Sequence, residues 1–142
     1  DLTKLQPLRR IGIGVHPTAI ALFVQIASEA EIDKDLIVDA VFVCNPVMHH
    51  LFLGIDPFEL GQAPFALATS DALSLRAIEL DLNIHPAARI YLLPCIAGHV
   101  GADAAGATLS EGPYRQDSMM LLVDVGTNAE IVLGNKKKRL LS

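Results

Sequence analysis

Two apolar runs near the end of the sequence, Met119 to Val125 and Ala129 to Gly134, are separated by only the three residues Gly126 to Asn128. A connection this short joins antiparallel strands, because parallel strands need a crossover of a dozen residues or more. Gly134-Asn135 is a second turn signal, and the run Lys138 to Leu141 follows it. The sequence therefore predicts a three-stranded antiparallel β-meander at 119–142.

The chain before this meander alternates helix-like and strand-like segments. Strands are predicted at Asp39 to Cys44 and Arg89 to Leu93, where short apolar or β-branched runs occur. Predicted helices surround them: Thr18 to Glu31, a short turn after Asp33, Pro46 to Gly54, Ser70 or Asp71 to Leu82, and about Val100 to Ser110. The segment 55–70, rich in proline and glycine, is an irregular connection. This alternation predicts an α/β fold with parallel strands over 1–112.

The helix predicted at about 100–110 contains almost no side-chain bulk, since Gly101, Ala102 and the run Ala104 to Ala107 dominate it. Such a helix packs with its backbone close to a neighbouring element, or moves against one. No repeat or low-complexity linker divides the sequence. We therefore expect a single domain, or part of one, and the end of the sequence within a predicted strand favours a part.

Composition restricts the class of protein. Hydrophobic residues make up 51% of the 142 residues and charged residues 19%, which is typical of a globular domain. A net charge of −5 argues against nucleic-acid binding, and the basic run Lys136 to Arg139 suits a solvated hairpin tip. The charge-free run Ile11 to Ser28 is interrupted by glycine and proline, so it is a poor membrane span. Two distant cysteines without metal-ligand spacing fit a cytoplasmic protein.

The connection "DVGTN" carries the residues typical of a phosphate loop. Gly126 allows a tight turn, and the amides of Gly126, Thr127 and Asn128 would converge on an anion. Asp124 would repel a phosphate directly, so this reading places Mg²⁺ between them. The alternative is a simple hairpin turn in which Gly126 only supplies a positive φ. The pattern is neither a Walker A loop nor GxGxxG.

Three segments in order carry a family resemblance: "VFVCNPVMHHLFLGIDPFELGQAPF", "IYLLPCIAGHVGADAAGATL" and "LLVDVGTNAEIVLGN". The last resembles the second phosphate motif of the ASKHA superfamily of actin-like ATPases. Together, over 39–142, they resemble the reductive activators of corrinoid proteins. Those are ATP-dependent iron–sulfur proteins that return corrinoid methyl-transfer proteins to the Co(I) state.

The resemblance implies a partial actin-like (ribonuclease H-like) ATPase fold in which ATP and Mg²⁺ are the cofactors. It also implies an iron–sulfur cluster in an upstream domain, a corrinoid protein as partner, and a lobe-to-lobe connecting helix at 100–110. The residues it places at the cofactor are Asp124, Gly126, Thr127, Asn128 and Glu130, with Asp124 holding Mg²⁺ through water.

The sequence departs from the family pattern in two ways. Pro46 stands where relatives commonly have threonine, and Ala129 where they often have glycine. Only one DxGT occurs, although an actin-like ATPase needs two phosphate hairpins, and two cysteines cannot ligate a four-ligand cluster. We therefore expect the chain alone to bind ATP weakly or not at all and to be inactive, as one part of the activator.

The sequence is also compatible with two other functions. The chain is alternatively a non-catalytic docking or dimerisation module of an iron–sulfur protein, whose apolar strands and small-residue helix serve an interface with a partner or a second copy. It is otherwise a kinase-like ASKHA relative, although the sequence shows no phosphoacceptor pocket. The pair His49-His50 invites a metal reading, but adjacent histidines on a helix point about 100° apart, so a core or interface role is expected.

Overall fold

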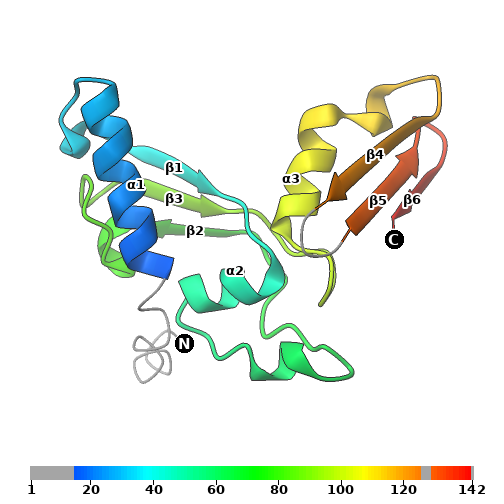
Figure 1. Cartoon of the computed structure of the whole chain (residues 1–142), viewed down its shortest axis with the longest axis horizontal. Helices are drawn as coiled ribbons and strands as arrows, with labels where there is room; N and C mark the ends of the chain where they lie inside the picture. The colour runs from blue at the N-terminus through cyan, green and yellow to red at the C-terminus, as the bar shows by residue number, and fades with distance from the viewer. Residues whose placement is uncertain (1–14, 126–128, 142) are drawn as a thin grey trace.

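The computed structural model describes residues 15–125 and 129–141, and the side chains within 18–125 and 129–138. Over these ranges the chain forms two three-stranded sheets at opposite ends of the molecule (Figure 1). One helix lies between the two sheets, and the remaining helices belong to the N-terminal end. The fold is a small mixed α/β structure followed by an antiparallel hairpin with a third strand.

The first sheet is mixed rather than all-parallel. Its strand order is β1-β3-β2, formed by β1 (Asp39–Phe42), β3 (Arg89–Leu92) and β2 (Leu73–Arg76). β1 runs parallel to β3, with Phe42 opposite Leu92, whereas β2 runs antiparallel to β3. The expected strands β1 and β3 are confirmed, and the expectation that all strands of this part are parallel is wrong.

The antiparallel strand comes from a segment that we expected to be helical. Instead of a helix from Ser70 or Asp71 to Leu82, the chain forms β2 and then the 3₁₀ turn η4 (Ala77–Leu80). Along β2, half-buried leucines alternate with exposed Ser74 and Arg76, which is the period-2 pattern of a strand. The apolar residues of this segment also fit the spacing of a helix. A helix and a strand can each bury one apolar face, so the spacing alone did not distinguish them.

Helix α1 (Val15–Glu29) covers one face of the first sheet (Figure 1). Phe23 of α1 meets Phe42 of β1 edge-on, with ring centroids 6.0 Å apart, and Phe42 stacks on Phe52 at 4.4 Å. The 3₁₀ turn η2 (Lys34–Leu36) follows, capped by Asp33, whose carboxylate accepts from the Asp35 amide. Among the described helices, none is long and apolar enough to cross a membrane.

Helix α2 (Pro46–Phe52) begins directly after β1. The Asn45 side chain caps it by accepting a 2.9 Å hydrogen bond from the Met48 amide, and Pro46 occupies the first turn. The helix ends before Gly54, whose φ of 71° lies in the left-handed region. An irregular segment with the short turn η3 (Phe58–Gly61) follows, as expected.

Helix α3 (Ala102–Glu111) is the small-residue helix, and it joins the two sheets. The carbonyl oxygen of Cys44, two residues after the end of β1, accepts from the amides of Ala102 at 3.0 Å and Asp103 at 3.3 Å. Farther along the helix, a Cβ added to Gly106 would lie 3.0 Å from Cγ1 of Val43. The predicted close backbone approach is therefore present, and it is made to Val43 and Cys44, the residues directly after β1.

The second sheet is the meander that the sequence predicts. After the 3₁₀ turn η5 (Pro113–Arg115), the strands β4 (Met120–Val125), β5 (Ala129–Gly134) and β6 (Arg139–Leu141) run in the order β4-β5-β6. Both pairings are antiparallel. Figure 1 shows α3 beside this sheet, on the side toward the first sheet.

We expect Gly101→Ala to destabilise the fold. A Cβ at Gly101 would lie 2.8 Å from both the Cys44 carbonyl oxygen and the Asn45 Cα, which are backbone atoms that cannot move aside easily. The expected loss in free energy of unfolding is about 1–3 kcal/mol, measured by urea denaturation. Gly61→Ala is the control, because nothing lies within 4 Å of the added Cβ. Equal stability of the two variants would contradict the prediction.

Candidate functional site

The β4–β5 hairpin carries all the site residues expected from the sequence. In its register Asp124 lies opposite Glu130, and Val125 lies opposite Ala129. The structure therefore brings Asp124 and Glu130 together at the end of the hairpin. Gly126, Thr127 and Asn128 connect the strands and lie outside the described residues, so their roles at a phosphate stay predictions.

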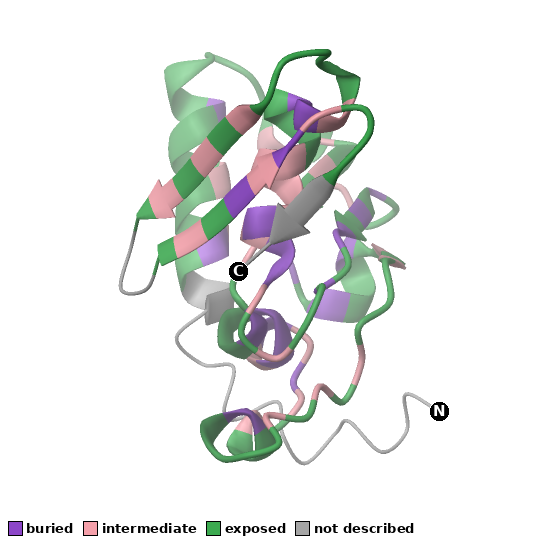
Figure 2. Cartoon of the chain, turned by 90° about the vertical axis from the view of Figure 1, so that its right-hand side faces the viewer, coloured by how far each residue is buried: buried purple, intermediate pink, exposed green. Residues whose placement is uncertain are grey.

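The two faces of the hairpin differ in polarity and burial. Partly buried and exposed residues alternate along β4 (Figure 2). Asp124 and Glu130 share the more buried face with the pair Leu122 and Val132, two residues back along each strand. The opposite face exposes large apolar side chains: Leu121, Val123, Val125 and Ile131.

The paired carboxylates have the chemistry of a cation site. Directly opposed like charges destabilise a strand pair, by roughly 0.2–1 kcal/mol, unless a cation lies between them. Among the described residues, no lysine, arginine or histidine forms an ion pair with Asp124 or Glu130. Carboxylate oxygens completed by water and phosphate oxygens are the ligands that Mg²⁺ prefers. The described residues contain no group of three or more potential ligands, so these two carboxylates alone do not make a self-sufficient metal site.

The three-residue connection itself predicts this carboxylate pair. Counting outward from Gly126 to Asn128 in an antiparallel hairpin pairs 125 with 129, and then 124 with 130. The family resemblance also indicates Glu130, but the length of the connection is the stronger signal for its pairing with Asp124. In contrast, the Cys44 carbonyl that holds α3 has no side-chain signature, because a backbone oxygen is present at every residue.

The two histidines of α2 are interior residues rather than metal ligands. His50 uses both ring nitrogens: Nδ1 donates to the Pro46 carbonyl at 2.8 Å, and Nε2 accepts from the Ala68 amide at 3.0 Å. This arrangement requires the neutral ring. His49 is fully buried, and neither of its ring nitrogens has a hydrogen-bond partner in the described structure. The expected interior role is confirmed for both.

Burial sets the protonation state of these histidines. It lowers the pKa of His49 below its usual value, and repulsion from His50 lowers it further. Burial also lowers the pKa of His50, against the opposing effect of the hydrogen bond to Pro46. Both rings are therefore neutral at pH 7, and protonating either places an uncompensated charge in the interior.

The cysteines do not fit an iron–sulfur cluster. Cys44 and Cys95 are the only two in the chain, both are free thiols, and a cluster needs four ligands. Burial raises the pKa of Cys44 to about 11, and the nearby Cys95 and Asp103 raise it in the same direction. The thiol is therefore protonated and unreactive at neutral pH.

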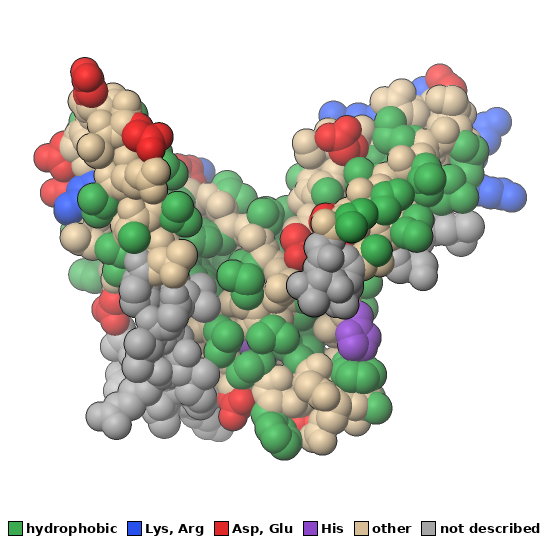
Figure 3. Space-filling view, in the orientation of Figure 1, with side chains coloured by type: hydrophobic (Ala, Val, Ile, Leu, Met, Phe, Trp, Pro, Cys, Tyr) green, Lys and Arg blue, Asp and Glu red, His purple; other side chains and the backbone are tan. Residues whose placement is uncertain are grey.

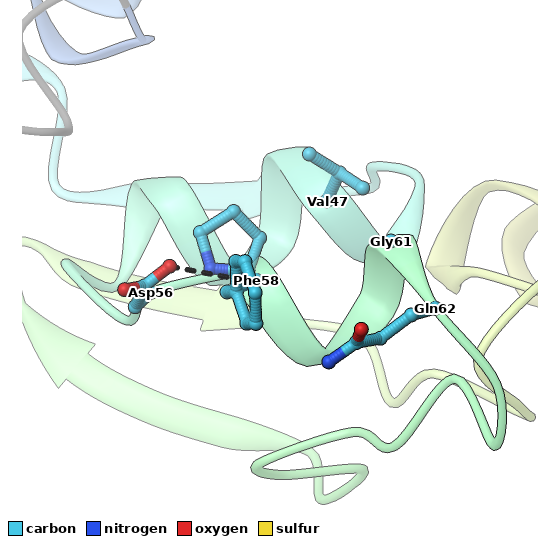
Figure 4. A pocket seen from close by; sticks show the side chains of 6 residues that line it. Val47, Asp56, Phe58, Gly61 and Gln62 are labelled. Atoms are coloured by element: carbon cyan, nitrogen blue, oxygen red, sulfur yellow. Dashed lines mark hydrogen bonds between the residues drawn. The ribbon is translucent and has the colours of Figure 1, made fainter.

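A surface pocket of about 510 Å³ lies beside η3 (Figure 4), and no residue of the hairpin lines it. Val47, Asp56, Pro57, Phe58, Gly61 and Gln62 line it. The Asp56 carboxylate accepts a 3.0 Å hydrogen bond from the Phe58 amide, so it serves the local turn. The pocket is open and its lining is mostly apolar. Its one carboxylate is hydrogen-bonded to the backbone, so the lining offers no group of catalytic residues.

Comparison with known proteins agrees with the resemblance found in the sequence. A family model described as the RACo middle region matches residues 5–116. The corrinoid activation enzyme RamQ of Eubacterium limosum is 36% identical over 133 residues, which are 94% of this chain and 22% of that enzyme. A solved reductive activator for corrinoid, iron-sulfur protein matches with a TM-score of 0.85 and 33% identity, over 96% of this chain and 21% of that one. The chain thus spans about a fifth of these relatives, and the hairpin lies beyond the residues that the family model matches.

We expect the stability of the chain to fall as pH decreases below about 6.5. The pKa of folded His49 is lower than that of the unfolded residue, so the unfolded state binds the extra proton first and is favoured by acid. His49→Leu should remove this contribution and reduce the slope by up to about 1.4 kcal/mol per pH unit. Urea denaturation at pH 7.5, 6.5 and 5.5 measures it. Identical slopes for the wild type and the variant would contradict the assignment.

Proposed function

The chain belongs to the RACo middle region family, and from that premise we propose that it is the middle part of a longer ATP-dependent reductive activator of corrinoid proteins. The match of the family model over residues 5–116 is the observation that carries this proposal. Its partner would be a corrinoid protein of a methyltransferase system. The names of the matched relatives, a corrinoid activation enzyme and a reductive activator, support that partner.

The proposed reaction moves one electron to the corrinoid and converts Co(II) to Co(I). An iron–sulfur domain elsewhere in the longer protein would supply the electron, since the two cysteines of this chain cannot hold a cluster. ATP binding and hydrolysis would drive the lobe motion that makes this unfavourable transfer possible. The residues of this chain contribute to binding the nucleotide and transmitting the motion.

The β4–β5 hairpin would provide one of the two phosphate-binding hairpins of an actin-like nucleotide site. Asp124 would hold Mg²⁺ through water, and the amides of Gly126, Thr127 and Asn128 would bind phosphate. Glu130, directly opposite Asp124, adds a second carboxylate on the same face of the hairpin. Nucleotide-bound Mg²⁺ would neutralise this pair, which gives the hairpin a higher affinity for the magnesium complex than for free ATP.

Helix α3 would transmit the motion between the two sheets. It is hydrogen-bonded to the end of β1 through the Cys44 carbonyl, and it contacts β4 at the other end of the molecule. Small residues at Gly101 and Gly106 bring its backbone close to its neighbours. A helix packed in this way can shift along an adjacent element without displacing large side chains, which is how shear motions occur.

A docking or dimerisation module is the second candidate function. The observation that favours it is the apolar face of the hairpin, where Leu121 and Val125 are 61% and 76% exposed. Exposed apolar faces of this kind mark interaction sites. The two functions are compatible in one molecule, because the carboxylates and these apolar residues occupy opposite faces.

We expect the 142-residue chain to bind Mg-ATP only weakly. It carries one DxGT segment, and an actin-like site needs two, so half of the contacts are missing. Isothermal titration with Mg-ATP should give no binding tighter than about 1 mM, equivalent to roughly −4 kcal/mol. A micromolar Kd for this chain would show that the site is complete. It would refute the proposal that the second phosphate hairpin lies outside this chain.

We expect Asp124→Asn in the longer protein to reduce ATPase activity by at least about tenfold, because a ligand to the magnesium shell loses its charge. Binding of the corrinoid protein, measured by surface plasmon resonance, should stay unchanged. Val125→Asn is the matched control for the ATPase activity, which it should leave unchanged: it introduces the same residue at the adjacent position on the opposite face. Intact ATPase activity in Asp124→Asn, together with lost partner binding in Val125→Asn, would instead support the docking function.

A further inference from the structure

We propose that the tip of the β5–β6 hairpin, the turn Lys136 to Lys138, docks on an acidic surface of the corrinoid protein. This inference rests on the proposed function for the identity of the partner, and it assigns the contact to one part of this chain. The partner surface that fits the tip is defined by its chemistry, which is exposed aspartate and glutamate side chains. Electrostatic attraction to the tip speeds and orients the encounter.

The first observation is the concentration of positive charge at this turn. The sequence has 11 lysines and arginines and a net charge of −5, yet Lys136, Lys137 and Lys138 follow one another. All three side chains are exposed. The turn lies at the end of the molecule farthest from α1 (Figure 1), and Figure 3 shows lysine and arginine side chains gathered at that end. An acidic chain therefore presents a basic tip.

The second observation is that hydrogen bonds fix the backbone of the turn. The side-chain oxygen of Asn135 accepts from the amides of Lys137 and Lys138, at 2.9 and 3.0 Å. The Asn135 amide donates to the Lys138 carbonyl at 2.7 Å, and the Lys136 amide donates to the Gln116 carbonyl at 2.8 Å. The lysine side chains therefore project from a preformed frame, so a partner that binds them orders little additional backbone.

The third observation is that most of this charge is not neutralised within the described part of the chain. Lys136 contacts Asp117 at 3.0 Å, but the Asp117 side chain is 90% exposed, and such exposed pairs are weak. Lys137 and Lys138 form no ion pair with any described residue. Two of the three ammonium groups are therefore free to attract carboxylates of another molecule.

The tip is separate from the proposed nucleotide site. Glu130 and Asn135 lie at opposite ends of β5, about 17 Å apart at the rise of an extended strand. A phosphate held beside Glu130 therefore lies far from the turn. The two ends of the strand can be engaged at the same time, one by the nucleotide and the other by a partner.

The chemistry of lysine favours a transient contact over a permanent one. The ammonium group is compact and strongly hydrated, and lysine is depleted from the buried centres of interfaces. A permanent seat within the same polypeptide is therefore disfavoured. At the rim of an interface, in contrast, opposite charge raises association rates by about 10- to 1,000-fold at low ionic strength.

The symmetry of contacts disfavours a second copy of this chain as the partner. Its own acidic residues Glu29, Glu31, Asp33 and Asp35 lie at the end of α1 and around η2. A tip that docked there would make a head-to-tail contact. Such contacts build open filaments unless their rotation closes a ring. A different protein with an acidic surface fits the tip without this consequence.

Association kinetics test the inference in the longer natural protein. The double variant Lys137→Glu/Lys138→Glu should lower the association rate constant for the corrinoid protein at least about tenfold in about 25 mM salt. The difference from the wild type should shrink in about 300 mM salt, because salt screens exposed charges. Surface plasmon resonance measures both rate constants, and the dissociation rate constant should change much less.

Lys34→Glu/Arg76→Glu is the matched control, since it changes the net charge by the same amount at the other end of the molecule. It should keep most of the wild-type association rate. Urea denaturation should show that both double variants are folded, because their side chains form at most exposed ion pairs. Equal association rates for the two double variants in low salt would overturn the inference.

Cross-linking with a carbodiimide identifies the chemistry of the contacted surface, because this reagent joins a lysine amine to a carboxylate in direct contact. Mass spectrometry should find links from Lys137 or Lys138 to aspartates or glutamates of the corrinoid protein, and none from Lys34. Links from the tip solely to a second copy would overturn the inference. Vesicles with anionic phospholipid should not bind the tip, and loss of vesicle binding in the double variant with unchanged corrinoid association would also overturn it.

These measurements separate the inference from the proposed function. If the wild type does not associate with the corrinoid protein, the proposed partner is wrong and the inference fails with it. If the wild type associates and the tip variant associates at the same rate, only the inference fails. The ATPase activity of the tip variant should equal that of the wild type, because the Asp124 and Glu130 pair lies at the other end of the hairpin.

Discussion

The carbonyl oxygen of Cys44 is the point on which the arrangement of the two sheets depends. It accepts from the first two amides of α3, which have no partners within the helix. The end of β1 and the start of α3 are thereby joined by backbone atoms alone. Asn45, the next residue, caps α2. One strand end therefore directs two helices, and the close approach at Gly101 leaves no space for a side chain between them.

The position of the hairpin follows from this junction. α3 ends at Gly112, in the left-handed conformation, and the chain turns through η5 into β4. In the sheet that follows, Asp124 of β4 and Glu130 of β5 lie on the more buried of the two faces. Because α3 contacts β4, a small shift of α3 relative to β1 would also move the hairpin that carries the carboxylate pair. The coupling between nucleotide state and lobe position that we propose requires such a connection.

The sequence predicts a helix or strand well where the spacing of its apolar residues fits only one of the two. The helices at α1, α2 and α3 and the meander β4-β5-β6 agree with their caps, glycines and apolar patterns. The prediction failed at β2, because Leu73, Ala77 and Leu80 satisfy a helical spacing while Leu73 and Leu75 satisfy that of a strand. Only pairing with β3 decides between them, and pairing is a tertiary property.

The junction at Cys44 was likewise beyond prediction, since it is made by backbone atoms. The carboxylate pair at 124 and 130 was predictable from loop length, whereas the roles of 126–128 remain predictions.

If the hairpin is one part of a nucleotide site, as we propose, the carboxylate pair also explains why that part would bind poorly by itself. Two like charges face each other across the hairpin, and the described residues supply no positive charge to either. A divalent cation would relieve the repulsion, but two carboxylates leave most of its coordination shell to water and phosphate. In the proposed site, the affinity for the nucleotide would therefore depend on a second set of phosphate contacts that holds the nucleotide in place. In the nucleotide site that we propose, the repulsion would favour closure around Mg-ATP and disfavour closure around an empty site, so the same two residues would contribute to both binding and discrimination.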